Sequence, residues 1–434
     1  MAYDFKEMND RARHRDLAQR RREQLQKRRL ILRWITFGAV MAVGILILIV
    51  ALARKDPADP SAETTTVPTT TTTVPTQTTT VPPTTTVPTE PETVIRLVFG
   101  GDVNVTDKVV AAGNRDGSFD YTQLLLDIAP LFADAHAAFL NLEGGFYGAP
   151  FGSASFSAPQ ALADAFAAAG VDMIQLANSR SIAGGLAGLS ATMDAVRAAG
   201  MYPLGVFSPN EAHQGYTLVN IGGIRVAIVA FTKGMDGMSL PAGSEGCVNL
   251  LYTDYATTSQ TVDEEGITRV LQAAQAQAPD LTIAMVHWGS EYNDTISPTQ
   301  KTIVELMQGL GVDAIVGTHS HFVQKVDYNE EKGTVVAYSL GDLLGDAEKA
   351  GTNYSILLQL EITRDNLTGQ TRITGCDYTG VYVLTPEKDA LPLQILRITP
   401  ALSMYENNHI GRISDLAYEN MLYAWKRIQA RVTG

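Results

Sequence analysis

Two histidines follow an apolar segment of this chain at a spacing that suits a shared binding site. Residues 312–316 have the composition of a buried strand, and Gly317-Thr318-His319-Ser320-His321 comes directly after them. Side chains at i and i+2 of an extended chain point the same way, so His319 and His321 are expected on one face. Imidazole is the commonest metal ligand in proteins. The pattern therefore predicts a metal site at the end of this strand.

Four other strand-like segments also end in polar residues. Open α/β sheets bind ligands at the carboxyl ends of their strands, so these residues are expected to gather at one edge. They are Asp102 and Asn104 after 94–100, Glu143 after 137–142, Asn178 and Arg180 after 171–176, and His287 after 281–286. Each of these polar residues alone could be a core residue or a helix cap. Because polar residues follow several strands in succession, a shared functional site is favoured.

The residues around His287 leave two interpretations open. His287 alone could be a packed histidine bonded to a backbone carbonyl, or a metal ligand. Glu291 and Tyr292 follow it closely and are expected to orient it from a second shell. Asp342, after Gly341, is interpreted as a structural residue that caps a turn.

The elements that must position these residues alternate between short β patterns and helical patterns, which predicts an α/β domain. Residues 354–398 are richer in β pattern, which indicates a mixed sheet or a second sheet. Residues 415–432 have apolar positions at helical spacing and are expected to pack as a helix. The other strands are expected at 94–100, 137–142, 171–176, 225–231, 281–286, 312–316, 334–340 and 354–362, and the other helices at 121–133, 159–169, 186–199, 268–278 and 299–310.

The N-terminal part carries the pattern of a membrane anchor. Residues 34–53 are uncharged and long enough to span a bilayer as a helix. The basic segment 1–33 has a net charge of +6, and the rest of the chain has −19. Positive charge stays inside, which predicts a single-pass cell-membrane protein with a cytoplasmic N-terminus and an extracellular C-terminal domain. A cleaved signal peptide is the competing interpretation, and Arg54-Lys55-Asp56-Pro57 offers no small-residue cleavage site for it.

A linker and a large domain follow the anchor. Residues 57–93 contain Thr-Thr-Thr-Val-Pro four times, and such a segment has too few apolar side chains to fold. We expect an extended extracellular stalk there, a folded domain over 94–402 and a C-terminal helix over 403–434 packed on it. Cys247 and Cys376 could pair in an oxidising compartment, but their spacing does not decide this.

The motifs resemble the CapA family of capsule synthesis proteins, which is associated with poly-γ-glutamate biosynthesis and has the PGA_cap domain. The resemblance runs from about residue 95 to residue 346. It implies a two-sheet α/β sandwich of the calcineurin-like metallophosphoesterase type. The motifs that carry it are, in order, Gly101-Asp102, Asn141-Leu142-Glu143, Ala177-Asn178, His287-Trp288-Gly289-Ser290-Glu291-Tyr292, Gly317-Thr318-His319-Ser320-His321 and Tyr338-Ser339-Leu340-Gly341.

The resemblance also implies a ligand set for a metal. Carboxylates and imidazoles together suit a single divalent ion such as Zn, Mn or Fe, with a position left for water. The implied ligands are Asp102, Glu143, His287, His319 and His321.

The chain departs from the family pattern at one place. Where the family has Ala-Asn-Asn-His, this chain has Ala177-Asn178-Ser179-Arg180, and arginine cannot ligate a metal. In one outcome a single metal is kept, and Arg180 with Asn178 and Asn104 binds an anionic substrate group. In the other, the Arg180 guanidinium takes the place of the cation, neutralises Asp102 and Glu143, and leaves a site without metal or catalysis.

Two classes of function remain. The favoured one is a component of capsule or poly-γ-glutamate synthesis or export with a partly degenerate metal site, acting beside membrane partners on an anionic polymer. The alternative is a metal-dependent hydrolase of a phosphodiester or amide bond in a cell-envelope polymer. Nucleic-acid binding is disfavoured because the chain is acidic beyond residue 33, and a polyanion would need a local basic site such as Arg180.

Overall fold

The computed structural model describes residues 91–209, 213–407 and 413–433. The predicted basic segment 1–33, the span 34–53 and nearly all of the linker 57–93 lie outside these ranges. Within them, no helix is long and apolar enough to cross a membrane. The first described strand begins at Glu92, two residues inside the predicted linker.

The larger sheet has eight strands and is mixed. Its central strand β1 pairs in parallel with β4 on one side and antiparallel with β14 on the other, and β13 adds a short parallel pairing at Asp102 and Asp342. The β-rich stretch expected near the C-terminus therefore extends this sheet. Its strands are β1 (Glu92–Asn104), β4 (Ala137–Glu143), β5 (Met173–Gln175), β6 (Tyr202–Leu204), β13 (Asp342–Leu344), β14 (Tyr354–Asp365), β15 (Thr371–Leu384) and β16 (Gln394–Arg397).

The second sheet has six strands in the order β11-β12-β10-β9-β8-β7. The inner four strands run parallel, and the two edge strands are antiparallel to their neighbours. Its strands are β7 (Tyr216–Ile221), β8 (Ile224–Thr232), β9 (Leu281–His287), β10 (Ala314–Thr318), β11 (Val326–Asn329) and β12 (Thr334–Ala337).

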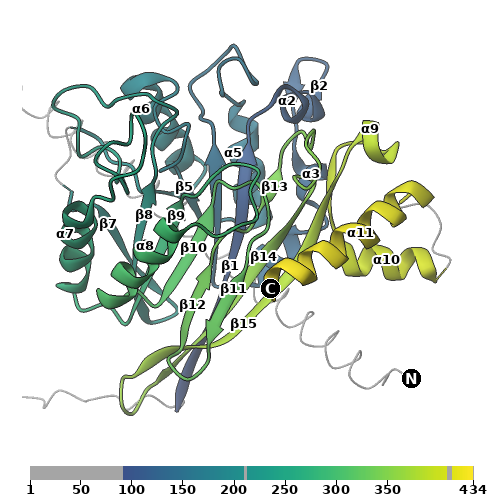
Figure 1. The fold of residues 1–434 in the computed structure, drawn as a ribbon. Coiled ribbons are helices and arrows are strands. Elements are labelled where there is room, and N and C mark those ends of the chain that lie inside the picture. Colours follow the sequence, from purple (N-terminus) through teal and green to yellow (C-terminus); the bar gives the residue numbers. More distant parts are fainter. Residues whose placement is uncertain (1–90, 210–212, 408–412, 434) are drawn as a thin grey trace, which may run out of the picture. The chain divides into compact units, whose positions relative to one another are not determined.

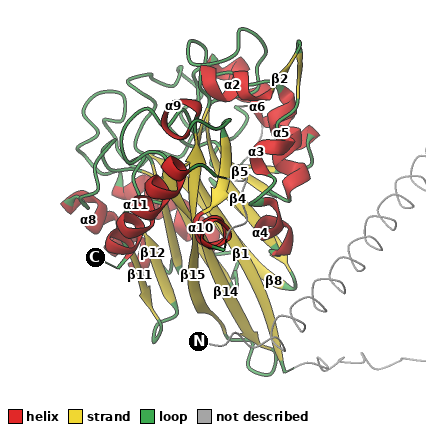
Figure 2. Ribbon diagram, turned by 90° about the vertical axis from the view of Figure 1, so that its right-hand side faces the viewer, coloured by secondary structure: helices red, strands yellow, loops and turns green. Residues whose placement is uncertain are grey.

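Helices cover the outer faces of the two sheets. In Figure 1, α7 and α8 flank the second sheet, and α10 and α11 lie on the opposite side of the domain. Figure 2 shows α10 and α11 in front of the strands of the larger sheet. The helices are α2 (Asp107–Gly113), α3 (Thr122–Leu125), α4 (Ala129–Asp134), α5 (Gln160–Ala169), α6 (Gly185–Ala198), α7 (Glu264–Gln275), α8 (Pro298–Gly309), α9 (Pro386–Asp389), α10 (Ile398–Glu406) and α11 (Asp415–Val432), and a hairpin is formed by β2 (Asn114–Arg115) and β3 (Ser118–Phe119).

The core lies between the sheets and under the helices, and strand β8 shows both layers. Val226, Ile228 and Ala230 belong to the main core that contains residues of both sheets. The alternate residues, such as Val229 and Phe231, pack in a second cluster with side chains of α7 and α8. Because successive side chains of a strand point to opposite faces, an unbroken apolar strand is required here. The predicted two-sheet α/β arrangement is confirmed.

Two predicted helical boundaries were wrong. The segment 121–133 is split into α3 and α4, because Pro130 lacks the backbone donor that a continuous helix needs and stands in the first turn of the new one. The predicted boundary between 402 and 403 falls inside α10. The helix expected at 415–432 has those bounds, and Ser414 caps it by accepting a hydrogen bond from Ala417 N.

The two cysteines do not form a disulfide. Cys247 is buried and Cys376 is half-buried, and both are free thiols.

Candidate functional site

Two glycines allow the strands that carry the site to approach one another closely. A Cβ on Gly101 would stand 1.8 Å from the carbonyl oxygen of Gly341, and Asp102 N donates to that same oxygen at 3.0 Å. A Cβ on Gly317 would stand 2.0 Å from the carbonyl oxygen of Tyr338. Only glycine fits at such positions. The glycines of the Gly-Asp and Gly-Thr-His motifs thus set the distance between strand ends.

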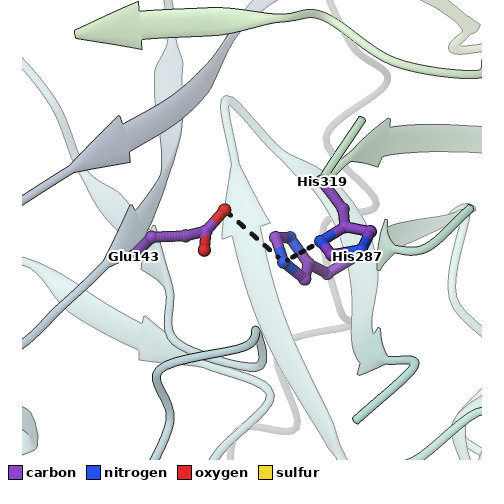
Figure 3. Close-up of side chains that lie close together, drawn as sticks. All are labelled: Glu143, His287 and His319. Atoms are coloured by element: carbon purple, nitrogen blue, oxygen red, sulfur yellow. Dashed lines mark hydrogen bonds and ion pairs between the residues drawn. The ribbon is translucent and has the colours of Figure 1, made fainter. Parts of the chain in front are cut away.

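The first candidate metal group consists of Glu143, His287 and His319. One ligand atom from each lies within 4.8 Å of the others, and all three residues are buried. Nε2 of His287 lies 3.0 Å from Nδ1 of His319 and 3.5 Å from Oε1 of Glu143. Figure 3 shows the carboxylate and the second imidazole converging on the ring of His287. The three side chains come from β4, β9 and the turn after β10.

Polar atoms around His287 exceed what its ring can satisfy. Besides His319 and Glu143, Oγ of Ser179 lies 3.2 Å from Nε2, although one ring nitrogen offers a single proton or a single lone pair. Oε1 of Glu143 is buried and has no hydrogen-bond partner among the described residues. A buried carboxylate oxygen left unpaired is strongly unfavourable. This orphaned oxygen beside two imidazoles fits a cation bound in the group.

The pKa shifts of the three residues in the first group favour binding of a cation. Burial lowers the pKa of His287 and of His319 well below the usual range, and neighbouring positive groups lower them further. Both rings therefore keep a lone pair at neutral pH. Burial, together with repulsion by Asp102, raises the pKa of Glu143 well above its usual value. An ionised Glu143 thus needs a positive partner that the described side chains do not supply at contact distance.

The second candidate group consists of Asp102, His321 and Asp342, also within 4.8 Å of one another and buried. Here the charges are paired internally. Nδ1 of His321 lies 2.8 Å from Oδ1 of Asp342. Burial acts to lower the pKa of His321, but the attraction and hydrogen bond of Asp342 outweigh it and raise the pKa to about 10. The imidazolium is the cation of this group.

Asp102 joins the two groups. Its Oδ2 accepts from His319 N at 2.9 Å, its Oδ1 accepts from Asn141 Nδ2 at 2.5 Å, and Oδ1 lies 3.8 Å from Nδ1 of His287. Burial and the nearby Asp342 carboxylate raise the pKa of Asp102 to about 6. The carboxylate thus orients the backbone of one candidate ligand and lies beside the ring of another.

His319 and His321 do not share one face of a strand, contrary to the expectation from their spacing. Strand β10 ends at Thr318, so His319 and His321 lie in a turn, with φ of +91° and +59°. The turn directs them into different groups, with ring centroids 6.3 Å apart. Such backbone conformations cost on the order of 1–3 kcal/mol each and concentrate at functional sites.

The two predicted substrate-binding asparagines differ in their surroundings. Asn178 is buried, and its Nδ2 donates to Asn141 Oδ1 at 3.0 Å and to Leu142 O at 2.6 Å, while its Oδ1 accepts from Arg180 N. Its polar atoms are engaged in holding the loop, so the expected role in substrate binding is replaced by a structural one. Asn104 lines the pocket beside the site and hydrogen bonds to Asp342.

Arg180 does not replace a metal cation. Its guanidinium pairs with Asp236 and lies over the ring of Phe156, 3.9 Å from the centroid. It lowers the pKa of Glu143 only from a distance, as the smallest of the several influences on that group. The hypothesis that Arg180 neutralises Asp102 and Glu143 by contact was wrong, because the pairing with Asp236 holds the side chain at the pocket.

Glu291 and Tyr292 do not surround His287 as expected. The ring of Tyr292 stacks on His321 at a centroid distance of 4.8 Å, and Glu291 is exposed. His287 is instead held by Thr318, whose Oγ1 lies 2.9 Å from Nδ1. The backbone turns at Tyr292, with φ of +54°, which carries the two residues away from the end of β9.

Sequence reasoning missed several residues of the site. Asn141 lies two positions before Glu143 on β4, so strand alternation alone placed it on the same face. Asp342 directly follows the Tyr-Ser-Leu-Gly motif, and it forms the ion pair of the second group where the sequence predicts only a turn cap. Ser179 was marked only as part of the departure from the family pattern, and no signal marked Thr318, because hydroxyl residues after strands are common.

A pocket opens beside the two groups. Its volume is about 240 Å³, and Glu143, His321 and Asp342 form part of its lining. Arg180, Asn104, Glu291 and Tyr292 also line it. Six of the predicted site residues therefore line one pocket, while the other four, Asp102, Asn178, His287 and His319, are buried and do not line it.

Comparison with known proteins gives relatives in capsule synthesis. "Capsule biosynthesis protein CapA" of Bacillus anthracis is 28% identical over 217 residues, which is 49% of this chain and 49% of that protein. "PGA biosynthesis protein CapA" of Bacillus subtilis is 25% identical over 222 residues, 50% of this chain and 54% of that protein. The chain spans about half the length of the curated relatives it matches.

Solved structures show only a slight likeness. A calcineurin-like phosphoesterase, YfkN of Bacillus subtilis, has 14% identity and a TM-score of 0.40, over 78% of this chain and 99% of that one. A novel phosphatase of Mycoplasma pneumoniae has 14% identity and a TM-score of 0.39, over 66% of this chain and 93% of that one. The sequence profile described as "Bacterial capsule synthesis protein PGA_cap" matches residues 96–347, more than half of the chain and all of both candidate groups. The chain belongs to this family of bacterial capsule synthesis proteins.

Proposed function

We propose that this protein takes part in the synthesis or export of an anionic capsule polymer of the poly-γ-glutamate type. The observation that carries the proposal is the family match, which includes every residue of the two candidate groups. We further propose that residues 34–53 anchor the chain in the cell membrane, with the N-terminus cytoplasmic and the folded domain extracellular. There it would act beside membrane partners of a polymer synthesis or export assembly.

The proposed cofactor is one divalent ion held by Glu143, His287 and His319. A carboxylate with two imidazoles suits Zn, Mn or Fe. The unpaired Oε1 of Glu143 and the neutral rings support this group over the second one, which contains its own ion pair. A bound ion there would supply Lewis-acid activation of water and of a phosphoryl or carbonyl oxygen. We expect this protein, whose fold is of the calcineurin-like metallophosphoesterase type, to bind a single ion.

The chain's own residues would bind and orient the polymer. Arg180 at the pocket pairs with Asp236 through one terminal nitrogen, and its remaining guanidinium donors can bind a carboxylate or phosphate group, while Asn104 offers an amide beside it. Thr318 orients the ring of His287, and Asp102 holds the turn that carries His319. Nucleic acid is not proposed as a ligand, because the chain beyond residue 33 has a net charge of −19.

A second candidate function is hydrolysis of a phosphodiester or amide bond in a cell-envelope polymer. The observation that favours it is a group of three candidate ligands next to a pocket. Catalytic zinc sites commonly have three protein ligands and leave one position for water or substrate. A purely binding role requires no such position.

Two measurements test these proposals. The full-length chain, purified in detergent and dialysed without chelator, is expected to retain about one divalent ion in elemental analysis. The variant Glu143→Gln is expected to retain much less, and Glu291→Gln, an exposed residue, serves as the matched control. Retention of no ion by the wild-type chain would contradict the metal proposal.

The cellular role and the hydrolase activity are tested separately. Deletion of the gene in its native host is expected to reduce the surface glutamate polymer, and unchanged polymer would contradict the proposed role. If the site hydrolyses polymer, the metal-loaded chain cleaves a γ-linked glutamate oligomer or bis-p-nitrophenyl phosphate, and Glu143→Gln does not. Restoration of polymer in the deletion strain by Glu143→Gln would favour the binding role over hydrolysis.

A further inference from the structure

A lysine outside the candidate metal groups lies on an aromatic ring of the same pocket. Nζ of Lys349 lies 3.1 Å from the centroid of the Tyr292 ring, and both residues line the pocket. The ring of Tyr292 also stacks on His321, which belongs to the second candidate group. The loop after β13 thus places a positive charge next to the site.

Lys349 differs from the other lysines near the site because its ammonium has no oxygen partner within the part of the chain that the structure describes. Lys233 donates to Gly289 O at 2.8 Å, Lys108 pairs with Glu348 and Glu387, and Lys388 donates to Ala347 O. An ammonium has three donors and no acceptor. The exposed ammonium of Lys349 therefore has no protein acceptor among the described residues to give up when a ligand binds, while the ring beneath it restricts its position.

The pocket contains a second cation on an aromatic ring. Arg180 lies over Phe156 and comes from the loop after β5, so two separate loops bring the same kind of pair into one pocket. Arg180 is already paired with Asp236, whereas Lys349 has no carboxylate within ion-pair distance among the described residues. Of the two cations, Lys349 is the one with an unused charge.

The size and charge of the pocket restrict the ligand. Its volume of about 240 Å³ is below the roughly 300–1,000 Å³ that is usual for whole small-molecule sites, so it suits one repeat or the end of a longer chain. Glu291, Asp346 and Glu348 also line it and would repel a dense polyanion. A chain with one carboxylate or phosphate per repeat meets both conditions.

We propose that Lys349, held on Tyr292, binds an oxyanion group of an anionic polymer segment and thereby places the neighbouring bond beside Glu143, the residue of the first group that lines the same pocket. The inference rests on the proposed role in anionic polymer synthesis, and it assigns Lys349 as a substrate-binding residue. The oxyanion is a carboxylate if the segment is a γ-linked glutamate chain, and a phosphate if it is a phosphodiester chain.

The test measures binding to the full-length chain by calorimetry, with γ-linked triglutamate and inorganic phosphate as separate probes. Lys349→Gln is expected to weaken one of them by about tenfold, the loss typical of a charged hydrogen bond. Lys349→Arg is expected to bind within roughly twofold of wild type, because the charge is kept. Lys332→Gln, an exposed lysine in the turn between β11 and β12, is the matched control.

The outcomes separate this inference from the proposed function. Weakened binding of triglutamate identifies the carboxylate, and weakened binding of phosphate alone identifies the phosphate. If Lys349→Gln binds both probes like wild type, or wild type binds neither, the inference is overturned, while elemental analysis decides the metal proposal independently. If wild type retains no metal and Lys349→Gln still weakens a probe, the metal proposal fails and the role of Lys349 stands.

Discussion

The two candidate metal groups both combine carboxylates with imidazoles, yet they differ in how their charges are satisfied. In the Glu143, His287 and His319 group, a buried carboxylate oxygen has no hydrogen-bond partner among the described residues, and both imidazoles are held neutral by burial. In the other group, Asp342 and His321 lie 2.8 Å apart and form an ion pair. The first group thus offers a candidate position for a cation, whereas the second contains the His321 imidazolium.

This difference teaches that residue types and proximity do not define a metal site. Both groups bring three ligand atoms within 4.8 Å, so distance alone ranks them equally. What separates them is whether each buried charge has a partner, because an unpaired buried charge is far more unfavourable than a paired one. The following predictions test this distinction.

The largest effect is expected on stability, at the ion pair of the second group. Asp342→Asn should lower the free energy of unfolding by about 3–5 kcal/mol, because it leaves a protonated His321 buried without its partner. Chemical denaturation measures this value. The double variant His321→Gln with Asp342→Asn should be less destabilised than the single one, and equal losses would contradict the ion pair.

The next effect concerns metal affinity at the first group. Glu143→Gln should weaken binding of Mn²⁺ or Zn²⁺ on the order of 100-fold, because it removes the one carboxylate of the group. Isothermal titration calorimetry with the metal alone measures the change. If Asp342→Asn weakened binding as much as Glu143→Gln, the two groups would not differ in the way described above.

The dependence of metal affinity on pH has a defined sign. The raised pKa of Glu143 means that the metal-free group holds a proton which metal binding releases, whereas His287 and His319 are already neutral. Affinity should therefore fall as the pH falls, by roughly tenfold per unit below the Glu143 pKa. Titrations at several pH values measure the slope, and an affinity independent of pH would contradict this assignment.

The smallest effect is expected beside the second group. Tyr292→Leu removes the ring stacked on His321 and should lower stability by about 0.5–1.5 kcal/mol. Thermal unfolding of the metal-free chain measures the loss, and Tyr423→Leu on the exposed face of α11 is a matched control. Metal affinity should stay within a few-fold of wild type, since the ring of Tyr292 contacts His321, Phe322 and Lys349 and no residue of the first group.

Much of the fold and part of the site followed from local pattern. Apolar runs ending in Asp102, Glu143 and His287 predicted strands that converge, because parallel strands present their carboxyl ends at one edge. Helix α11 was predicted with its observed bounds from its apolar spacing, and the structure adds a second local signal in the capping Ser414. The break between α3 and α4 could have been expected from Pro130.

The sequence by itself determined which residue types stand at the strand ends, because strand periodicity, glycine and proline act over a few residues. Only the tertiary structure decided which of these residues belong to which candidate metal group. The turn after β10 sends His319 to Glu143 and His321 to Asp342, and Asp236 holds Arg180 away from the carboxylates. These partners are far apart in the chain, and whether a buried charge is paired depends on distances that no local pattern encodes.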